Sequence, residues 1–230
     1  MYPGTDRDYW IYVPAQYKPG QAASLMVFQD GKAYVNSATF NALDNLIHQG
    51  DIPVMIGVFI NPGVVPPQNE NAQARFNRSL EYDDMSDRYS QFLIDELLPH
   101  IERAHGVTFS TDPNLRGITG ASSGAICAFN VAWHRPDSFH RVYSTIGTYV
   151  GLRGGDEIPT LIRKTEPKPL RMPPILIGGG GERVLMGIAA RVADIWNNLA
   201  IFQPQLATKI EALRRRCDEI GRDPDSIEIS

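Results

Sequence analysis

The sequence predicts an α/β protein in which a largely parallel sheet carries helices on both faces. Strand-like and helical segments alternate along the chain, which is the pattern of strands joined by crossover helices. Residues 53–60 form a nearly continuous apolar run, as is typical of a parallel strand buried on both faces. Residues 120–124 follow an apolar strand and open a helical pattern, which indicates a strand–turn–helix junction. The length of 230 residues allows one such domain or two small ones.

The first third of the chain supplies three strands and one helix. Residues 9–13 are aromatic and β-branched and stop at a proline, and residues 25–28 form a short apolar strand. Residues 40–47 repeat apolar side chains at helical spacing before a glycine suited to end a helix. The apolar run at 53–60 is the third strand. Residues 61–80 are rich in proline, asparagine and glutamine, so we expect a long surface loop there.

The middle of the chain continues the alternation. Ser86 is placed to cap a helix that runs past Pro99, where we expect a kink. Residues 115–119 predict a strand that leads into the glycine-containing turn. Residues 123–135 predict a helix that stops before a proline, and residues 140–146 predict another strand.

The C-terminal part reads less regularly. We expect a loop at residues 151–171, a strand at 174–177 and a glycine run at 178–181 that is followed by a helix. A strand at 192–196, a helix at 206–220 and a strand at 227–229 complete the chain. Gly221 is a natural stop for the last helix.

Composition excludes several classes of function. A net charge of −4 gives no electrostatic case for binding nucleic acid, and no apolar stretch is long enough to cross a bilayer. The first residues have neither the charged nor the apolar region of a signal peptide, so we expect a cytoplasmic location or leave the location open. The two cysteines, Cys127 and Cys217, fall in helical patterns, so we expect buried thiols rather than a disulfide or a metal site.

The segment Gly120-Ala121-Ser122-Ser123-Gly124 has the G-x-S-x-G pattern of a nucleophile elbow. A sharp turn between strand and helix exposes the serine oxygen, which makes Ser122 the candidate nucleophile. The alternative is a glycine-rich turn without chemistry. An acyl-transfer oxyanion needs two N–H donors. We expect them from Ser123, which follows the nucleophile, and from Lys32, which follows an earlier strand; an ordinary Asp-Gly turn is the alternative at Lys32.

Residues 1–171 resemble the enterochelin esterase-like and esterase D branch of the α/β-hydrolases, akin to mycobacterial mycolyltransferases. The matching segments are residues 2–5, 8–14, 27–31, 77–89, 120–124 and 162–169. The resemblance implies a three-layer α/β-hydrolase-like fold with a doubly wound, mostly parallel sheet. It also implies Ser122 as nucleophile, the N–H groups of Lys32 and Ser123 as oxyanion hole, a small-molecule acyl ester as substrate, and no cofactor.

The resemblance breaks after residue 171. Family members continue with a strand that ends in an acidic residue and later supply a histidine from a Gly-Gly-His segment. Here residues 172–230 are similar instead to the C-terminal part of luciferase-like flavin or deazaflavin monooxygenases. We therefore expect a chimeric chain with a junction near Arg171-Met172. Its hydrolase-like sheet, incomplete at the C-terminal side, would be completed by a foreign βαβ segment.

The catalytic base is missing from its usual place. The five histidines are His48, His100, His105, His134 and His140, and none follows residue 140. Each is expected at the far end of a helix or the wrong edge of the sheet. His134, for example, lies twelve residues down the helix from Ser122, or roughly 18 Å at 1.5 Å per residue. Glu182 follows the strand where the family keeps its acid, but there is no histidine for it to orient.

These observations predict a serine esterase-type hydrolase of small acyl esters with an impaired triad. Two alternatives stay open. One is a flavin- or deazaflavin-binding monooxygenase fragment, which the glycine run supports. The other is a non-catalytic remnant or interaction module. The sequence also leaves open a homodimer and a histidine supplied by a partner chain.

Overall fold

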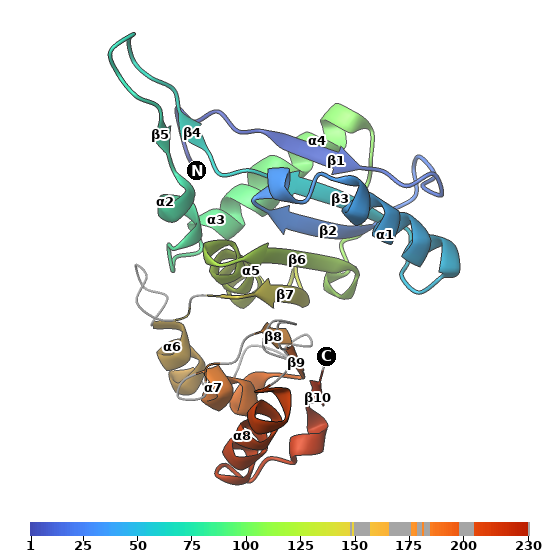
Figure 1. Cartoon of the computed structure of the whole chain (residues 1–230). Coiled ribbons are helices and arrows are strands. Elements are labelled where there is room, and N and C mark those ends of the chain that lie inside the picture. Colours follow the sequence, from blue (N-terminus) through green and yellow to red (C-terminus); the bar gives the residue numbers. More distant parts are fainter. Residues whose placement is uncertain are drawn as a thin grey trace.

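The computed structural model describes residues 1–147, 149, 157–165, 176–178, 181, 185–197 and 205–229. Its centre is an eight-stranded sheet in the order β1-β3-β2-β6-β7-β8-β9-β10 (Figure 1). The strands are β1 (Tyr9–Tyr12), β2 (Ser24–Gln29), β3 (Met55–Ile60), β6 (Arg116–Ala121), β7 (Arg141–Thr145), β8 (Leu176–Gly178), β9 (Ile195–Asn197) and β10 (Glu228–Ile229). Among the described strands of this sheet, only β1 is antiparallel to its neighbour, so the predicted mostly parallel sheet is confirmed.

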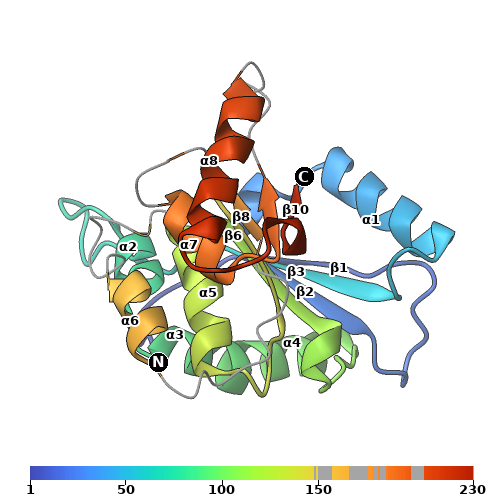
Figure 2. The ribbon, with the colours of Figure 1, turned by 90° about the horizontal axis from the view of Figure 1, so that it is seen from below.

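Helices cover both faces and give the three layers expected of an α/β-hydrolase-like fold. Figure 2 shows α1 on one side of the sheet and α3, α4 and α5 on the other. The helices are α1 (Ser37–Gln49), α2 (Arg78–Tyr82), α3 (Arg88–Gln91), α4 (Leu98–His105), α5 (Ser123–His134), α6 (Ile158–Lys164), α7 (Leu185–Val192) and α8 (Leu206–Asp218). Short 3₁₀ turns occupy Gly31–Ala33, Pro113–Leu115 and Pro224–Ser226.

The main hydrophobic core lies between the sheet and the layer formed by α3, α4 and α5. Alternate residues of the strands point into it, among them Val27, Val58 and Ile118, all fully buried. The opposite face of β2 and β3 packs Phe28 and Phe59 against α1. Because both faces of these central strands are buried, their sequences are nearly continuous apolar runs. The candidate site lies at the carboxyl ends of these central strands.

Two segments interpreted as loops contain regular structure. Within residues 61–80, β4 (Val64–Val65) pairs with β5 (Arg75–Phe76) in a two-stranded ribbon, and α2 begins at Arg78. Figure 1 shows this ribbon projecting from the body of the protein. Within residues 151–171, α6 packs Ile158 and Ile162 against α5. The prediction of a loop was wrong there. The two isoleucines are spaced as on one face of a helix, so the sequence itself indicated the helix.

The expected kink at Pro99 takes a different form. The helix that begins at Arg88 widens into a π-helical segment over Phe92–Leu97, directly before α4, in which Pro99 lies in the first turn. Proline has no N–H and is tolerated in a first helical turn. Ser86 lies just before the helix, and its Oγ accepts the Arg88 N–H at 3.3 Å.

The C-terminal segment adds β8, β9 and β10 to the same sheet and builds a hydrophobic cluster of its own. β8 pairs in parallel with β7, and β9 and β10 follow it. Trp196, Leu213 and Cys217 are buried in this cluster together with residues of α7. Cys127 is buried in the main core, so both cysteines are buried thiols as expected. In the described parts of the chain, no helix is long and apolar enough to span a membrane.

Candidate active site

The turn between β6 and α5 is the most constrained backbone of the site. Ser122 has φ 80° and ψ −111°, a conformation rare for any residue except glycine. Its N–H donates to the Thr145 carbonyl at 3.2 Å, and its carbonyl accepts the N–H groups of Ala125 and Ile126. Such strain costs of order 1–3 kcal/mol and persists only where neighbouring structure enforces it. Here β7 and the first turn of α5 enforce it.

The glycines of the turn are required by close packing. A Cβ added to Gly120 would lie 2.4 Å from the backbone of Gly124. A Cβ on Gly124 would approach Asp30 Oδ2 to 3.2 Å. The G-x-S-x-G pattern therefore records a tight strand–turn–helix crossing that also presses against the loop after β2.

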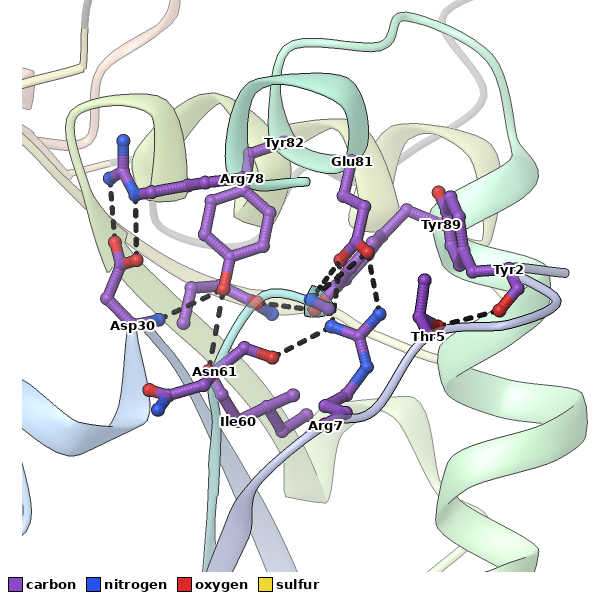
Figure 3. Close-up of polar contacts among 12 residues, drawn as sticks. Tyr2, Thr5, Arg7, Asp30, Ile60, Asn61, Arg78, Glu81, Tyr82 and Tyr89 are labelled. Atoms are coloured by element: carbon purple, nitrogen blue, oxygen red, sulfur yellow. Dashed lines mark hydrogen bonds and ion pairs between the residues drawn. The ribbon is translucent and has the colours of Figure 1, made fainter. Parts of the chain in front are cut away.

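The loop after β2 carries Lys32, whose N–H is the other predicted oxyanion donor. Asp30 has φ 56°, and Gly31 is held so closely against β3 that an added Cβ would lie 2.3 Å from Ile60 N. The Asp30 N–H donates to Tyr82 Oη at 3.1 Å, and Tyr82 donates in turn to the Ile60 carbonyl at 3.4 Å (Figure 3). The loop is thus fixed both to the end of β3 and to α2.

The predicted residues come from neighbouring strands at one edge of the sheet. β3, β2 and β6 are adjacent and parallel, so the chain leaves all three at the same edge. Ser122 and Ser123 follow β6, and Lys32 follows β2. The Ser123 N–H lies in the first turn of α5, where amides have no acceptor earlier in the helix. The Lys32 N–H donates to Asn61 Oδ1 at 3.0 Å, and Asn61 follows β3.

An ion pair that the sequence analysis did not single out lies beside the elbow. Arg78 donates from Nε and Nη2 to the two carboxylate oxygens of Asp30, at 2.7 Å each (Figure 3). Arg78 Nη2 also lies 3.5 Å from the carbonyl of Ala121, the last residue of β6. The hydrogen bonds that Arg78 donates to the Asp30 carboxylate raise the pKa of Arg78. Because the two charges balance, this ion pair adds no net charge beside the elbow.

A second ion pair is buried behind the site. Arg7 makes two 2.8 Å contacts to Glu81, and the side chains are only 7% and 0% exposed. Glu81 also accepts the Gly63 N–H, and Arg7 also donates to the Asn61 carbonyl at 2.8 Å. Figure 3 shows these groups converging from the N-terminal segment, the end of β3 and α2. The pair therefore fixes the backbone that carries Asn61.

All five histidines lie away from the elbow. His134 ends α5, the helix that Ser123 begins, and its Nε2 lies 2.9 Å from the Met85 carbonyl. His140 directly precedes β7, at the opposite edge of the sheet from Ser122, and contacts Asn114. His48 lies in the last turn of α1, while His100 and His105 lie in α4 beside Tyr9.

Cys127 and Glu182 are the other groups to consider. Burial raises the pKa of the Cys127 thiol well above its ordinary value, so this side chain on α5 is a neutral core residue. Glu182 and the expected junction at Arg171-Met172 lie outside the described residues, as do two of the four glycines of the run. No group of side chains able to hold a metal ion occurs in the described ranges.

Comparisons with known proteins agree with this fold. Residues 2–153 match the family model described as "Putative esterase". The enterobactin esterase of Shigella flexneri, solved in the presence of enterobactin, has a TM-score of 0.60 and 18% identity; the match covers 97% of this chain and 48% of that one. A ferulic acid esterase has a TM-score of 0.56 and 16% identity over 97% of this chain and 83% of its own. The chain thus spans about half the length of the enterobactin esterase. No curated protein matches it.

Proposed function

Because the chain belongs to the Esterase family, we propose that it is a serine esterase-type hydrolase of small acyl esters. Ser122 is the proposed nucleophile. The observation that carries the proposal is the backbone of Ser122, a serine held at φ 80° between a parallel strand and a helix. Ordinary βα turns do not need a strained non-glycine residue, whereas a nucleophile elbow does.

In the proposed reaction, Ser122 Oγ attacks the ester carbonyl carbon and loses its proton to solvent water, while the carbonyl oxygen becomes an oxyanion. The N–H groups of Ser123 and Lys32 are the proposed donors to that oxygen. The start of α5 adds the positive end of the helix dipole. The C–O bond to the alcohol then breaks, which leaves an acyl group on Ser122, and water releases the acid in a second attack.

Proton transfer is the weak step of this proposal. His48, His134 and His140 lie at the far ends of their elements from the elbow, and His100 and His105 pack against Tyr9 of β1, three strands away from β6. A general base and acid contribute about 10²–10⁴ to such reactions. We therefore propose an impaired triad, which turns over esters with good leaving groups slowly and esters with poor leaving groups still less.

The test is hydrolysis of short-chain nitrophenyl esters, because nitrophenolate leaves without a proton. Ser122→Ala should lower the protein-dependent rate, but only modestly, because the proposed oxyanion donors stay in place. Ser37→Ala, a matched change at an exposed serine of α1, should leave it unchanged. Equal rates for wild type and Ser122→Ala would reject the proposed nucleophile. A feruloyl ester belongs in the substrate panel, because one of the similar structures is a ferulic acid esterase.

We propose further that residues 1–171 and 172–230 are two units of different origin, the second of them luciferase-like. The separate cluster around Trp196, Leu213 and Cys217 supports the division, since a transplanted βαβ segment would bring its own core. A homodimer is also proposed, with β10 as the pairing edge, because an edge strand offers unpaired backbone groups. Sedimentation velocity tests the dimer.

A further inference from the structure

The side chain of Asn61 is hydrogen-bonded to the Lys32 N–H, a donor that the proposed mechanism needs. It is the first residue after β3, next to the loop that follows β2. Its Oδ1 accepts the Lys32 N–H at 3.0 Å. The same N–H is the proposed second donor to the oxyanion, so in the structure a side-chain oxygen already lies where a substrate oxygen would be received.

The backbone of Asn61 is fixed, while its side chain extends from it. The Asn61 N–H donates to the Asp8 carbonyl at 3.1 Å, and its carbonyl accepts from Arg7 at 2.8 Å. Arg7 is held in turn by the buried Glu81 (Figure 3). Neither backbone group can turn without breaking this network. The side chain, which is half-buried, can leave the Lys32 N–H by rotating about its own χ angles.

The oxygen of a carboxamide resembles that of an ester. Both are planar carbonyl acceptors, and an N–H makes one well-directed hydrogen bond at a time. We propose that Asn61 Oδ1 is a resting-state stand-in for the substrate's carbonyl oxygen, which must swing away before the Lys32 N–H can stabilise the oxyanion. This inference rests on the proposed esterase function and deepens it by naming a residue that competes with the substrate.

Because Asn61 would compete with the substrate, Asn61→Ala should raise kcat/KM rather than lower it. Truncation removes the competing acceptor and leaves Lys32 N–H open to the substrate. A net hydrogen bond of ordinary strength corresponds to a rise in kcat/KM of about two- to tenfold. If Asn61 instead supported the loop or donated to the oxyanion, the same change would lower kcat/KM.

Asn61→Asp tests the same contact with nearly unchanged shape. A carboxylate accepts hydrogen bonds more strongly than an amide oxygen and repels a developing oxyanion. We expect kcat/KM at pH 7 to fall by about tenfold or more. The ratio of variant to wild-type rates should recover as the pH falls through about 4, where an ordinary aspartate becomes protonated. Asn45→Ala and Asn45→Asp, at an exposed position of α1, are the matched controls and should leave the rates unchanged.

A readout independent of activity is the Lys32 backbone amide in a ¹⁵N–¹H NMR spectrum. Loss of the Asn61 acceptor should move its proton resonance upfield in Asn61→Ala but not in Asn45→Ala. Melting temperatures of all four variants check that they fold.

The outcomes separate the two claims. If Ser122→Ala does not lower ester turnover, the proposed function fails and the inference fails with it. If Ser122→Ala lowers turnover while Asn61→Ala lowers kcat/KM, or leaves the Lys32 resonance in place, only the inference is overturned. A rise in kcat/KM with Asn61→Ala, a fall with Asn61→Asp and the upfield shift together would support it.

Discussion

Replacing Glu81 by glutamine should destabilise the fold far more than an ordinary surface substitution. Glu81 is fully buried and receives two hydrogen bonds from Arg7 and one from the Gly63 N–H. Glutamine keeps the shape but removes the negative charge, and its NH₂ group then faces donors. Arg7, only 7% exposed, is left as a buried charge without a counter-ion. Breaking a buried ion pair in this way costs about 3–5 kcal/mol.

The assay is equilibrium unfolding in urea, together with a thermal scan. At about 2–4 °C per kcal/mol for a chain of this size, the melting temperature should fall by roughly 6–20 °C. Glu219→Gln is the matched control. It pairs with Arg216 at the same 2.8 Å distance, but these side chains are 57% and 38% exposed. An exposed pair contributes about 0–1 kcal/mol, so the control should change little.

A loss of less than about 1 kcal/mol for Glu81→Gln would refute the reasoning, because the pair would then behave as an exposed one does. The double variant Arg7→Met with Glu81→Leu separates charge burial from packing. Replacing both partners of a buried pair by apolar residues is often neutral or stabilising, so the double variant should recover much of the loss. An additive loss would show that packing, not charge, holds this region together.

Three further predictions concern other parts of the chain. Ile146 is a half-exposed β-branched residue at φ 46°, a backbone conformation that asparagine adopts more readily. Ile146→Asn should therefore raise the free energy of unfolding by up to about 1 kcal/mol and raise the melting temperature. A lower melting temperature would show that the backbone at Ile146 is not strained. Burial raises the pKa of Tyr149 to about 12, so the stability that its burial provides is complete below pH 10 and is lost as the pH rises from 10 to 12. Tyr149→Phe should lessen that alkaline loss in pH-dependent unfolding, and an unchanged pH profile would contradict the assignment. Flavin mononucleotide should not raise the melting temperature; a ligand at a hundred times its Kd stabilises by about 2.7 kcal/mol, so a clear rise would revive the monooxygenase alternative.

The elements predictable from sequence are those with local causes. The strand at Met55–Ile60 is an uninterrupted apolar run because both its faces are buried. The turn at Ser122 was legible because close packing demands glycine on either side of it. By the same local logic, Ile158 and Ile162 of α6 could have been recognised as one face of a helix.

The polar network behind the site could not be read from sequence, because its partners are distant along the chain. Arg7 and Glu81 are 74 residues apart, and Arg78 and Asp30 are 48 apart. A charged residue in a polar segment ordinarily indicates a solvated surface. What makes these residues structural is the approach of three separate segments at one edge of the sheet, which depends on strand order. The contact of Asn61 could not be predicted for the same reason, since its partner Lys32 follows a different strand.

The two halves of esterase chemistry have different structural sources in this chain. The proposed oxyanion donors are backbone N–H groups, which the loop after β2 and the start of α5 carry. Proton transfer depends on a side chain, and in the proposed impaired triad none of the five histidines of this sequence serves as that base. Loss of triad members can leave a residual acceleration of about 10³–10⁴ over water, which the oxyanion hole and binding supply. If the proposed function holds, the rate missing from this protein is therefore the proton-transfer part. Supplying a base in solution, such as free imidazole, should raise wild-type turnover of activated esters more than that of Ser122→Ala, and an equal increase in both would place the reaction outside the elbow.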